Sequence, residues 1–231
     1  MQFCSLGSGS QGHSFLIKHQ NSCILLDCGF GLAETEKRLK FHKVSPAEID
    51  AILLTHEHED HVKGAFSISN KYSLPIYLTH GTHSMCFKRN KASFNIDFRF
   101  IVNEKKFNIN KINITPITVP HDAREPVQFK FVTNDSKFAI ITDLGFGSPY
   151  LLKSLCDLTA IIIECNHEDK LLQISDYPQS IKNRVSGRYG HLNNKEAARI
   201  LKYITNKNLK FIGAAHLSDK NNNPDFVKKE L

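Results

Sequence analysis

The chain has 231 residues and a mass of 26.2 kDa, enough for one sizeable hydrophobic core, so we expect a single domain over residues 1–231. Hydrophobic residues make up 41% of it, which excludes a disordered protein, and no apolar run is long enough to span a bilayer. The first ten residues lack the basic and apolar segments of a signal peptide, so we expect a cytoplasmic protein without membrane association. The net charge of +7 suits a polyanionic partner such as nucleic acid.

Short apolar runs alternate with amphipathic segments along the chain. The apolar runs predict ten β-strands, at 14–18, 23–26, 51–54, 76–78, 99–102, 112–119, 127–133, 137–141, 160–163 and 211–214. Helical spacing of apolar residues predicts helices at 33–41, 61–71, 79–90 and 195–205, the last with Asn193 or Asn194 as its N-cap. This mixture predicts a layered α/β domain with substantial sheet.

The six cysteines contain no C-x-x-C pair, and several of them stand inside apolar runs. This spacing indicates neither a zinc knuckle nor a disulfide framework. We expect free and mostly buried thiols in a reducing compartment.

Potential metal ligands follow the predicted strands. The run T-H-E-H-E-D-H places His56, His58, Asp60 and His61 directly after the strand at 51–54. The other candidates, each just past a further strand, are His121, Asp143 and His216. Loops that leave the same edge of a sheet converge, so these side chains can share one pocket.

The number of ligands indicates two metal ions. One tetrahedral zinc uses three or four protein ligands, and seven candidates exceed that number. We assign His56, His58 and His121 to the first ion, Asp60, His61 and His216 to the second, and Asp143 to both as a bridge. Taken singly, His121 or His216 is more often a loop or core residue, and Asp143 can be a turn residue, but the dense H-E-H-E-D-H cluster has no obvious packing role.

The motif resembles the T-H-x-H-x-D-H signature of the metallo-β-lactamase fold. The fold's other motifs follow the same order, with Asp27 in L-L-D-C-G, His121 in V-P-H-D-A, Asp143 in I-T-D-L-G and His216 in A-A-H-L-S. The resemblance implies a four-layer αββα sandwich with a dinuclear site at one edge of the sheets. It also implies that Asp27 orients the ligands without binding metal.

Within that superfamily the chain is similar to the YycJ-like (WalJ, VicX) branch, which implies a DNA exonuclease. The similarity rests on S-L-G-S-G-S-Q-G near the N-terminus, I-E-C-N-H-E at 163–168 and G-H-L-N-N at 190–194. The branch more usually has Asn at position 13 and Ser at position 193, where this chain has His13 and Asn193. Only 72 residues separate Asp143 from His216, which leaves no room for the β-CASP insertion of related RNA-processing nucleases.

The G-H-L-N-N segment precedes a predicted helix N-terminus, where free N–H groups favour an anion. We therefore expect His191 and Asn194 to contact a substrate phosphate, with His167 as a weaker candidate. The segment can equally serve only to cap the helix, and His167 can be a surface loop residue. Arg184, Arg188 and Lys182 form either a basic approach for nucleic acid or a solvated loop.

Two divalent ions would supply a metal-bridging hydroxide that attacks phosphorus. In that mechanism Asp60 accepts a proton and His191 stabilises developing negative charge, so these two residues are the catalytic candidates. Zinc suits the histidine-rich set, and manganese or iron suits its carboxylates. Two alternatives to a nuclease acting on DNA stay open: hydrolysis of a small thioester or lactone, and a non-catalytic nucleic-acid-binding protein with a structural metal site.

Overall fold

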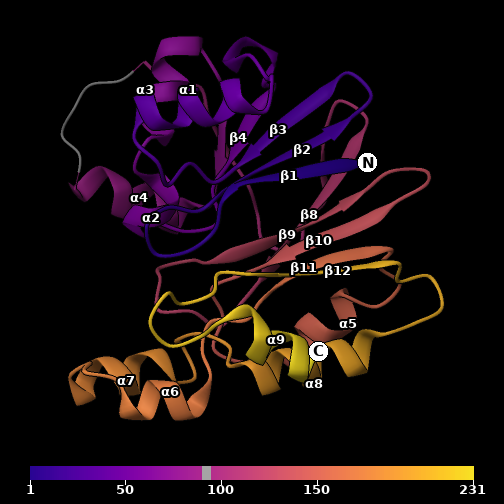
Figure 1. Cartoon of the computed structure of the whole chain (residues 1–231). Helices are drawn as coiled ribbons and strands as arrows, with labels where there is room; N and C mark the ends of the chain where they lie inside the picture. Colours follow the sequence, from indigo (N-terminus) through magenta and orange to yellow (C-terminus); the bar gives the residue numbers. More distant parts are fainter. Residues whose placement is uncertain (90–94) are drawn as a thin grey trace. The chain divides into compact units, whose positions relative to one another are not determined.

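The computed structural model describes residues 1–89 and 95–231. The chain divides into two compact units. Unit 1 contains Met1–Pro116 and Ala123–Val127, and unit 2 contains Ile117–Asp122 and Gln128–Leu231. The expectation of a single domain stays a prediction. Figure 1 shows the helices and strands of both units, coloured along the sequence.

The sheet of unit 1 has six strands in the order β1-β2-β3-β4-β5-β6. Their bounds are Gln2–Gly7, Ser14–His19, Ser22–Leu26, Ala51–Leu53, Ile76–Leu78 and Phe98–Phe100. The first three strands pair antiparallel, whereas β3, β4, β5 and β6 pair parallel. All residues of β3 and β4 are buried, which explains why these strands are continuous apolar runs without alternation.

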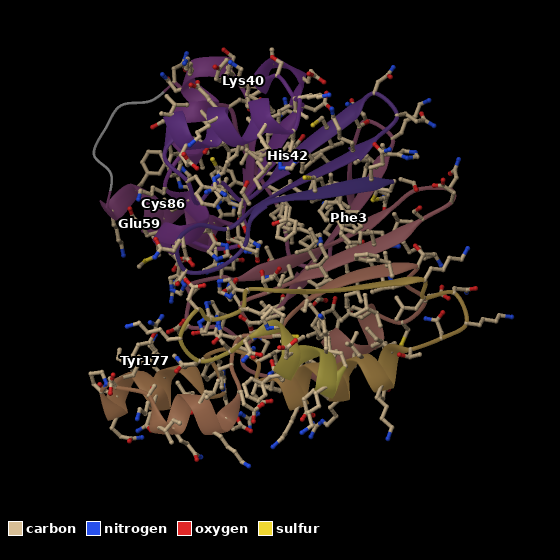
Figure 2. The ribbon with its side chains drawn as sticks, viewed as in Figure 1. Phe3, Lys40, His42, Glu59, Cys86 and Tyr177 are labelled. Carbon is tan, nitrogen blue, oxygen red and sulfur yellow. The ribbon has the colours of Figure 1, made fainter. Side chains whose placement is uncertain are left out.

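Helices cover one face of this sheet, where Leu39, Phe66 and Ile68 pack with strand residues in one core. The helices of unit 1 are α1 (Leu32–Phe41), η1 (Pro46–Glu48), α2 (Glu59–Val62), α3 (Ala65–Tyr72) and α4 (His80–Arg89). Figure 2 labels Glu59 at the start of α2 and His42 just after α1.

The helix predicted at 61–71 is two helices, α2 and α3, with Gly64 at the break. A Cβ at Gly64 would lie 2.1 Å from the carbonyl oxygen of Phe30, so this close approach requires glycine. The prediction treated the segment as continuous because its apolar spacing runs through Gly64. The helix predicted at 79–90 is α4, and Asn90 lies outside the described residues.

The second sheet has the order β12-β11-β10-β9-β8-β7. The strands are β7 (Phe107–Ile109), β8 (Ile112–Thr118), β9 (Val127–Val132), β10 (Lys137–Ile141), β11 (Ala160–Glu164) and β12 (Phe211–Ala215). β9 and β10 pair antiparallel, whereas β10, β11 and β12 pair parallel. These last three strands therefore end at one edge.

The helices of unit 2 are α5 (Pro149–Ser154), α6 (Asp169–Ile174), α7 (Gln179–Val185), α8 (Asn194–Ile204) and α9 (Pro224–Glu230). Figure 1 shows α5, α8 and α9 along β11 and β12. α8 buries Ala197, Ile200, Leu201 and Ile204 against that sheet. Asn193 is its N-cap, because the Asn193 side chain accepts a hydrogen bond from the backbone N–H of Glu196 at 2.7 Å.

All ten predicted strands are present, with ends that differ by at most two residues, and the predicted α/β class is confirmed. Sequence patterns missed β1 and β7 as well as the short helices η1, α5, α6, α7 and α9. The six cysteines are free, and four of them are buried, as expected. Among the described residues, none of the helices combines the length and the apolar character needed to cross a membrane.

Candidate metal and substrate site

In unit 1, the candidate residues lie in the segments that directly follow β3 and β4. These strands pair parallel, with Ile24 opposite Ala51 and Leu26 opposite Leu53. Asp27 directly follows β3, and the loop that carries Thr55 to His61 follows β4. Parallel pairing therefore brings Asp27 to the start of the histidine-rich loop.

Asp27 holds this loop through three hydrogen bonds. Its Oδ1 accepts from the backbone N–H of Thr55 at 2.9 Å, and its Oδ2 accepts from the Thr55 hydroxyl at 2.9 Å. Oδ2 also lies 2.8 Å from Nδ1 of His61. Both Asp27 and His61 are fully buried. The carboxylate thus fixes the ring orientation of His61 and directs Nε2, the other ring nitrogen, away from Asp27.

His56, His58 and Asp60 lie close to these two residues. Nε2 of His56 is 3.0 Å from Nδ1 of His58, and Nδ1 of His56 is 2.9 Å from the Thr55 hydroxyl. The Asp60 carboxylate approaches Nε2 of His61 at 3.7 Å. The loop therefore presents two pairs of donor atoms, one from His56 and His58 and one from Asp60 and His61. In each pair the two atoms lie close enough together to bind the same cation.

In unit 2, three acidic or histidine residues stand at the ends of three parallel strands. Asp143 follows β10, Glu164 ends β11, and His216 follows β12. Together with His191 they offer ligand atoms within 4.8 Å of one another. Asp143 and His216 have backbone φ values of +54° and +56°, a conformation uncommon outside glycine and found in other proteins at functional sites.

Glu164 is the residue at the centre of this cluster. Its Oε1 lies 2.8 Å from Nδ1 of His191 and 2.8 Å from Nδ1 of His216, and its Oε2 accepts backbone hydrogen bonds from Leu192 and Leu144. Burial opposes its charged form, but the attraction of His191 and the hydrogen bonds outweigh burial and lower the pKa of Glu164 to about 2. Glu164 is therefore ionised at neutral pH.

Glu164 was not among the predicted site residues, although the motif I-E-C-N-H-E contains it. The signal was an acidic residue at the end of a buried strand, which is also the position of Asp143 relative to β10.

His121 and His191 complete the cluster in unit 2. Nδ1 of His121 lies 3.1 Å from the carbonyl oxygen of Gly190, and the ring centres of His121 and His191 are 5.4 Å apart. Burial disfavours the charged imidazolium of His191, but the charges of Glu164 and Asp143 outweigh burial and raise its pKa. His191 is thus a hydrogen-bond donor next to two carboxylates.

The expected substrate residues differ in their accessibility. His167 follows β11 and lines a cavity that His191 and Asn193 also line. Asn194 is fully buried, and its amide group exchanges hydrogen bonds with that of Asn222 at 2.8 and 3.1 Å. Asn193, one position earlier, is the asparagine that faces the cavity. The sequence pattern could not distinguish the two, because either can cap the helix.

The donor set in each unit fits divalent metal ions. Imidazole and carboxylate groups are the ligands that zinc, manganese and iron share. In both units a buried carboxylate contacts Nδ1 of a candidate histidine, Asp27 at His61 and Glu164 at His216. This carboxylate–histidine pairing is the usual support of a metal-binding imidazole.

The comparisons with known proteins identify the family of the chain. The sequence profile of the β-lactamase superfamily domain matches residues 23–213. The fold of YhfI, a metallo-β-lactamase fold protein from Bacillus subtilis, superposes with a TM-score of 0.76 at 19% identity, covering 99% of this chain and 90% of YhfI. The chain belongs to the metallo-β-lactamase superfamily.

Two curated relatives are similar along nearly the whole chain. Exodeoxyribonuclease YycJ of Bacillus anthracis is 32% identical, covering 100% of this chain and 88% of its own length. Exodeoxyribonuclease WalJ of Streptococcus pneumoniae is 29% identical, covering 96% of this chain and 83% of its own length. These similarities confirm the YycJ-like branch and the expected class, a metal-dependent hydrolase.

Proposed function

We propose that the protein is a dinuclear-metal-dependent phosphodiesterase that degrades DNA from an end. The observation that carries the proposal is the similarity, over the full chain, to a relative named as an exodeoxyribonuclease. The net charge of +7 supports a nucleic-acid substrate. The buried free cysteines suit the cytoplasmic location that we include in the proposal.

The proposed ligands are the seven that the sequence indicates. His56, His58 and His121 would hold one ion, Asp60, His61 and His216 the other, and Asp143 both. Support comes from within each unit: the 3.0 Å spacing of His56 and His58 nitrogens, the 3.7 Å spacing of Asp60 and His61, and the grouping of Asp143 with His216. Zinc is our first choice, with manganese or iron as alternatives.

When bound, two such ions lower the pKa of water enough to supply hydroxide near neutral pH and polarise a phosphoryl oxygen. The protein's own groups then position and neutralise the substrate. Asp60 accepts a proton at its carboxylate, which lies beside His61. His191 donates a hydrogen bond to a phosphate oxygen from Nε2, because its Nδ1 already contacts Glu164. Asp27 keeps His61 in place.

The test is digestion of end-labelled DNA and RNA, each single- and double-stranded, by purified protein with zinc or manganese. We expect metal-dependent shortening of DNA from one end, abolished in His58→Ala. A matched control is His19→Ala, which removes a histidine at the end of β2, outside the loops after β3 and β4. If the protein bound two ions but digested none of these substrates, the nuclease proposal would be wrong. Hydrolysis of a small thioester or lactone would then be the proposed function.

A further inference from the structure

Unit 2 contains a cavity of about 310 Å³ beside the His191 cluster. His167 and His191 line it from the segments that follow β11 and α7, and Asn193, at the N-terminus of α8, lines it as well. Phe146, Arg188 and Arg199 line it too. The volume is at the lower end of the range for small-molecule sites, so the cavity admits a ligand of about one nucleotide.

His167 is a buried polar side chain that lacks a partner. Its exposed fraction is 1%, and neither ring nitrogen has a hydrogen-bond partner in the part of the chain that the structure describes. The nearest carboxylate, that of Asp169, is 3.9 Å from Nε2, too far for a hydrogen bond. A buried imidazole without a partner is costly, so the ring is positioned for a ligand in the cavity.

The backbone on both sides of His167 is fixed. Its carbonyl oxygen accepts the N–H of Asn194 at 3.0 Å, and the next residue, Glu168, donates its N–H to the carbonyl oxygen of Asn221 at 2.9 Å. These hydrogen bonds hold the backbone that carries the ring in place beside the cavity.

The groups around His167 favour an anion. Among the lining residues, Arg188 and Arg199 contribute two positive charges against one carboxylate, Glu196, which lies 3.4 Å from Nε of Arg199. A second carboxylate, Asp169, lies outside the lining at 3.9 Å from Nε2 of His167 and accepts a hydrogen bond from the amide of Asn193. The N-terminus of α8, an eleven-residue helix, adds the partial positive charge of its dipole. A phosphate group matches this combination of guanidinium and imidazole donors.

The same cavity has a surface for a nucleobase. The guanidinium of Arg188 lies over the ring of Phe146, with 4.6 Å from its central carbon to the ring centre. Bases stack on aromatic rings and on guanidinium planes with little regard to sequence. Arg188 and Arg199 are exposed, whereas His167 is buried, so the phosphate end lies deep and the base lies near the opening.

We propose that this cavity binds the terminal nucleotide of a strand through its phosphomonoester, so that the enzyme prefers phosphorylated ends. This deepens the proposed nuclease function and rests on it. A terminal phosphomonoester carries more negative charge than an internal phosphodiester, so the two guanidinium groups favour an end over an internal position. The neighbouring His191 cluster is where the adjoining phosphodiester would react.

The first experiment measures binding of dAMP and of deoxyadenosine to the full chain after metal removal with a chelator, by titration calorimetry. We expect dAMP to bind at least about tenfold more tightly than deoxyadenosine. Arg199→Gln should weaken the binding of dAMP by about tenfold and leave the binding of deoxyadenosine unchanged. His167→Ala should weaken the binding of dAMP by a similar factor. Lys202→Gln, which removes an exposed charge from the same helix outside the cavity, is the control. Equal affinities for the two compounds, or an Arg199→Gln variant that binds dAMP normally, would overturn the proposal.

The second experiment compares digestion of DNA with a phosphate or a hydroxyl at the 5′ end, and separately at the 3′ end, with metal present. Faster digestion of one phosphorylated end, lost in Arg199→Gln, identifies which end enters the cavity. Equal rates for all four ends would contradict the end preference. Binding of dAMP without any DNA digestion would support the nucleotide site and contradict the proposed nuclease function. Failure of the nucleotide site and failure of the nuclease proposal therefore give different results.

Discussion

Oδ2 of Asp27 lies 2.8 Å from Nδ1 of His61, and the same carboxylate accepts two hydrogen bonds from Thr55. Asp27 contacts Nδ1 of His61, which leaves Nε2 of His61 as the candidate metal ligand. Asp27 should therefore affect metal affinity by holding the orientation of the His61 ring. We expect Asp27→Asn, which keeps the shape and removes the charge, to weaken metal binding by about 10–100-fold. Competition with a chromogenic zinc chelator measures this.

Asp50→Asn is the matched control for Asp27→Asn. Asp50 also accepts a backbone hydrogen bond, from Cys23 at 2.7 Å, but it precedes β4 and does not follow a strand of the site. Its removal should leave metal affinity unchanged. Equal loss in both variants would show that Asp27 supports only the fold.

Gly29 lies in the segment after β3, close to the backbone of the histidine-rich loop. A Cβ at this position would lie 1.6 Å from the carbonyl oxygen of Asp60 and 2.6 Å from the backbone nitrogen of His13. Gly29→Ala should therefore displace Asp60 and cost about 1–3 kcal/mol of unfolding free energy. Urea unfolding and zinc stoichiometry, measured together, test both effects.

Gly31 provides the comparison two residues away. A Cβ there would have nothing within 4 Å, so Gly31→Ala should change the unfolding free energy by less than about 1 kcal/mol and retain bound metal. If both variants behaved alike, the close approach of Asp60 would not explain the glycine at position 29.

The sequence predicted the strands well because buried strands in parallel pairing are continuous apolar runs. β3 and β11 are such runs, and the rule that parallel strands end at one edge correctly grouped Asp143 with His216 in unit 2. Prediction failed where few residues are buried: β7 buries only Ile109, α6 buries only Leu172, and α7 buries none of its residues.

The supporting contacts of the site were harder to predict than its proposed ligands. Histidine and aspartate motifs are visible in the letters, whereas the role of Glu164 depends on two histidines that lie 27 and 52 residues away. The cavity beside His167 was equally hidden, because Phe146 and Arg188 are 42 residues apart in sequence and meet only after folding. Long-range pairings of this kind have no local pattern.

Glu164 should contribute strongly to stability as well as to the site. Removing its side chain in Glu164→Ala leaves the buried N–H of Leu192 and two imidazoles without their acceptor. An unsatisfied buried donor costs about 1–3 kcal/mol, so the metal-free variant should lose at least about 2 kcal/mol of unfolding free energy. Urea unfolding at neutral pH measures it. A loss below about 0.5 kcal/mol would show that water replaces the carboxylate without cost.

The cysteines should differ sharply in their reactivity. Cys156 is exposed, whereas burial raises the pKa of the Cys28 and Cys165 thiols to about 12. Only the thiolate reacts with iodoacetamide, so at pH 8 the folded protein should be labelled first at Cys156. Peptide mass spectrometry over time identifies the site. Early labelling of Cys165 would indicate that the end of β11 opens readily.

The raised pKa of the Cys23 thiol predicts a loss of unfolding free energy at alkaline pH. Burial, opposed by Lys18, raises the pKa of this thiol from 9.0 to about 11. Between pH 9 and pH 11 the thiol loses its proton in the unfolded chain but keeps it in the folded protein. The contribution of Cys23 to the unfolding free energy is therefore complete below pH 9 and is lost as the pH rises toward 11. The difference in unfolding free energy between the wild type and Cys23→Ala should therefore narrow over this interval, which urea unfolding at several pH values measures. Titrations of groups that do not interact with Cys23 are common to both proteins and cancel in the difference. A gap that stayed constant from pH 8 to 11 would mean that the thiol titrates alike in the folded and unfolded chains.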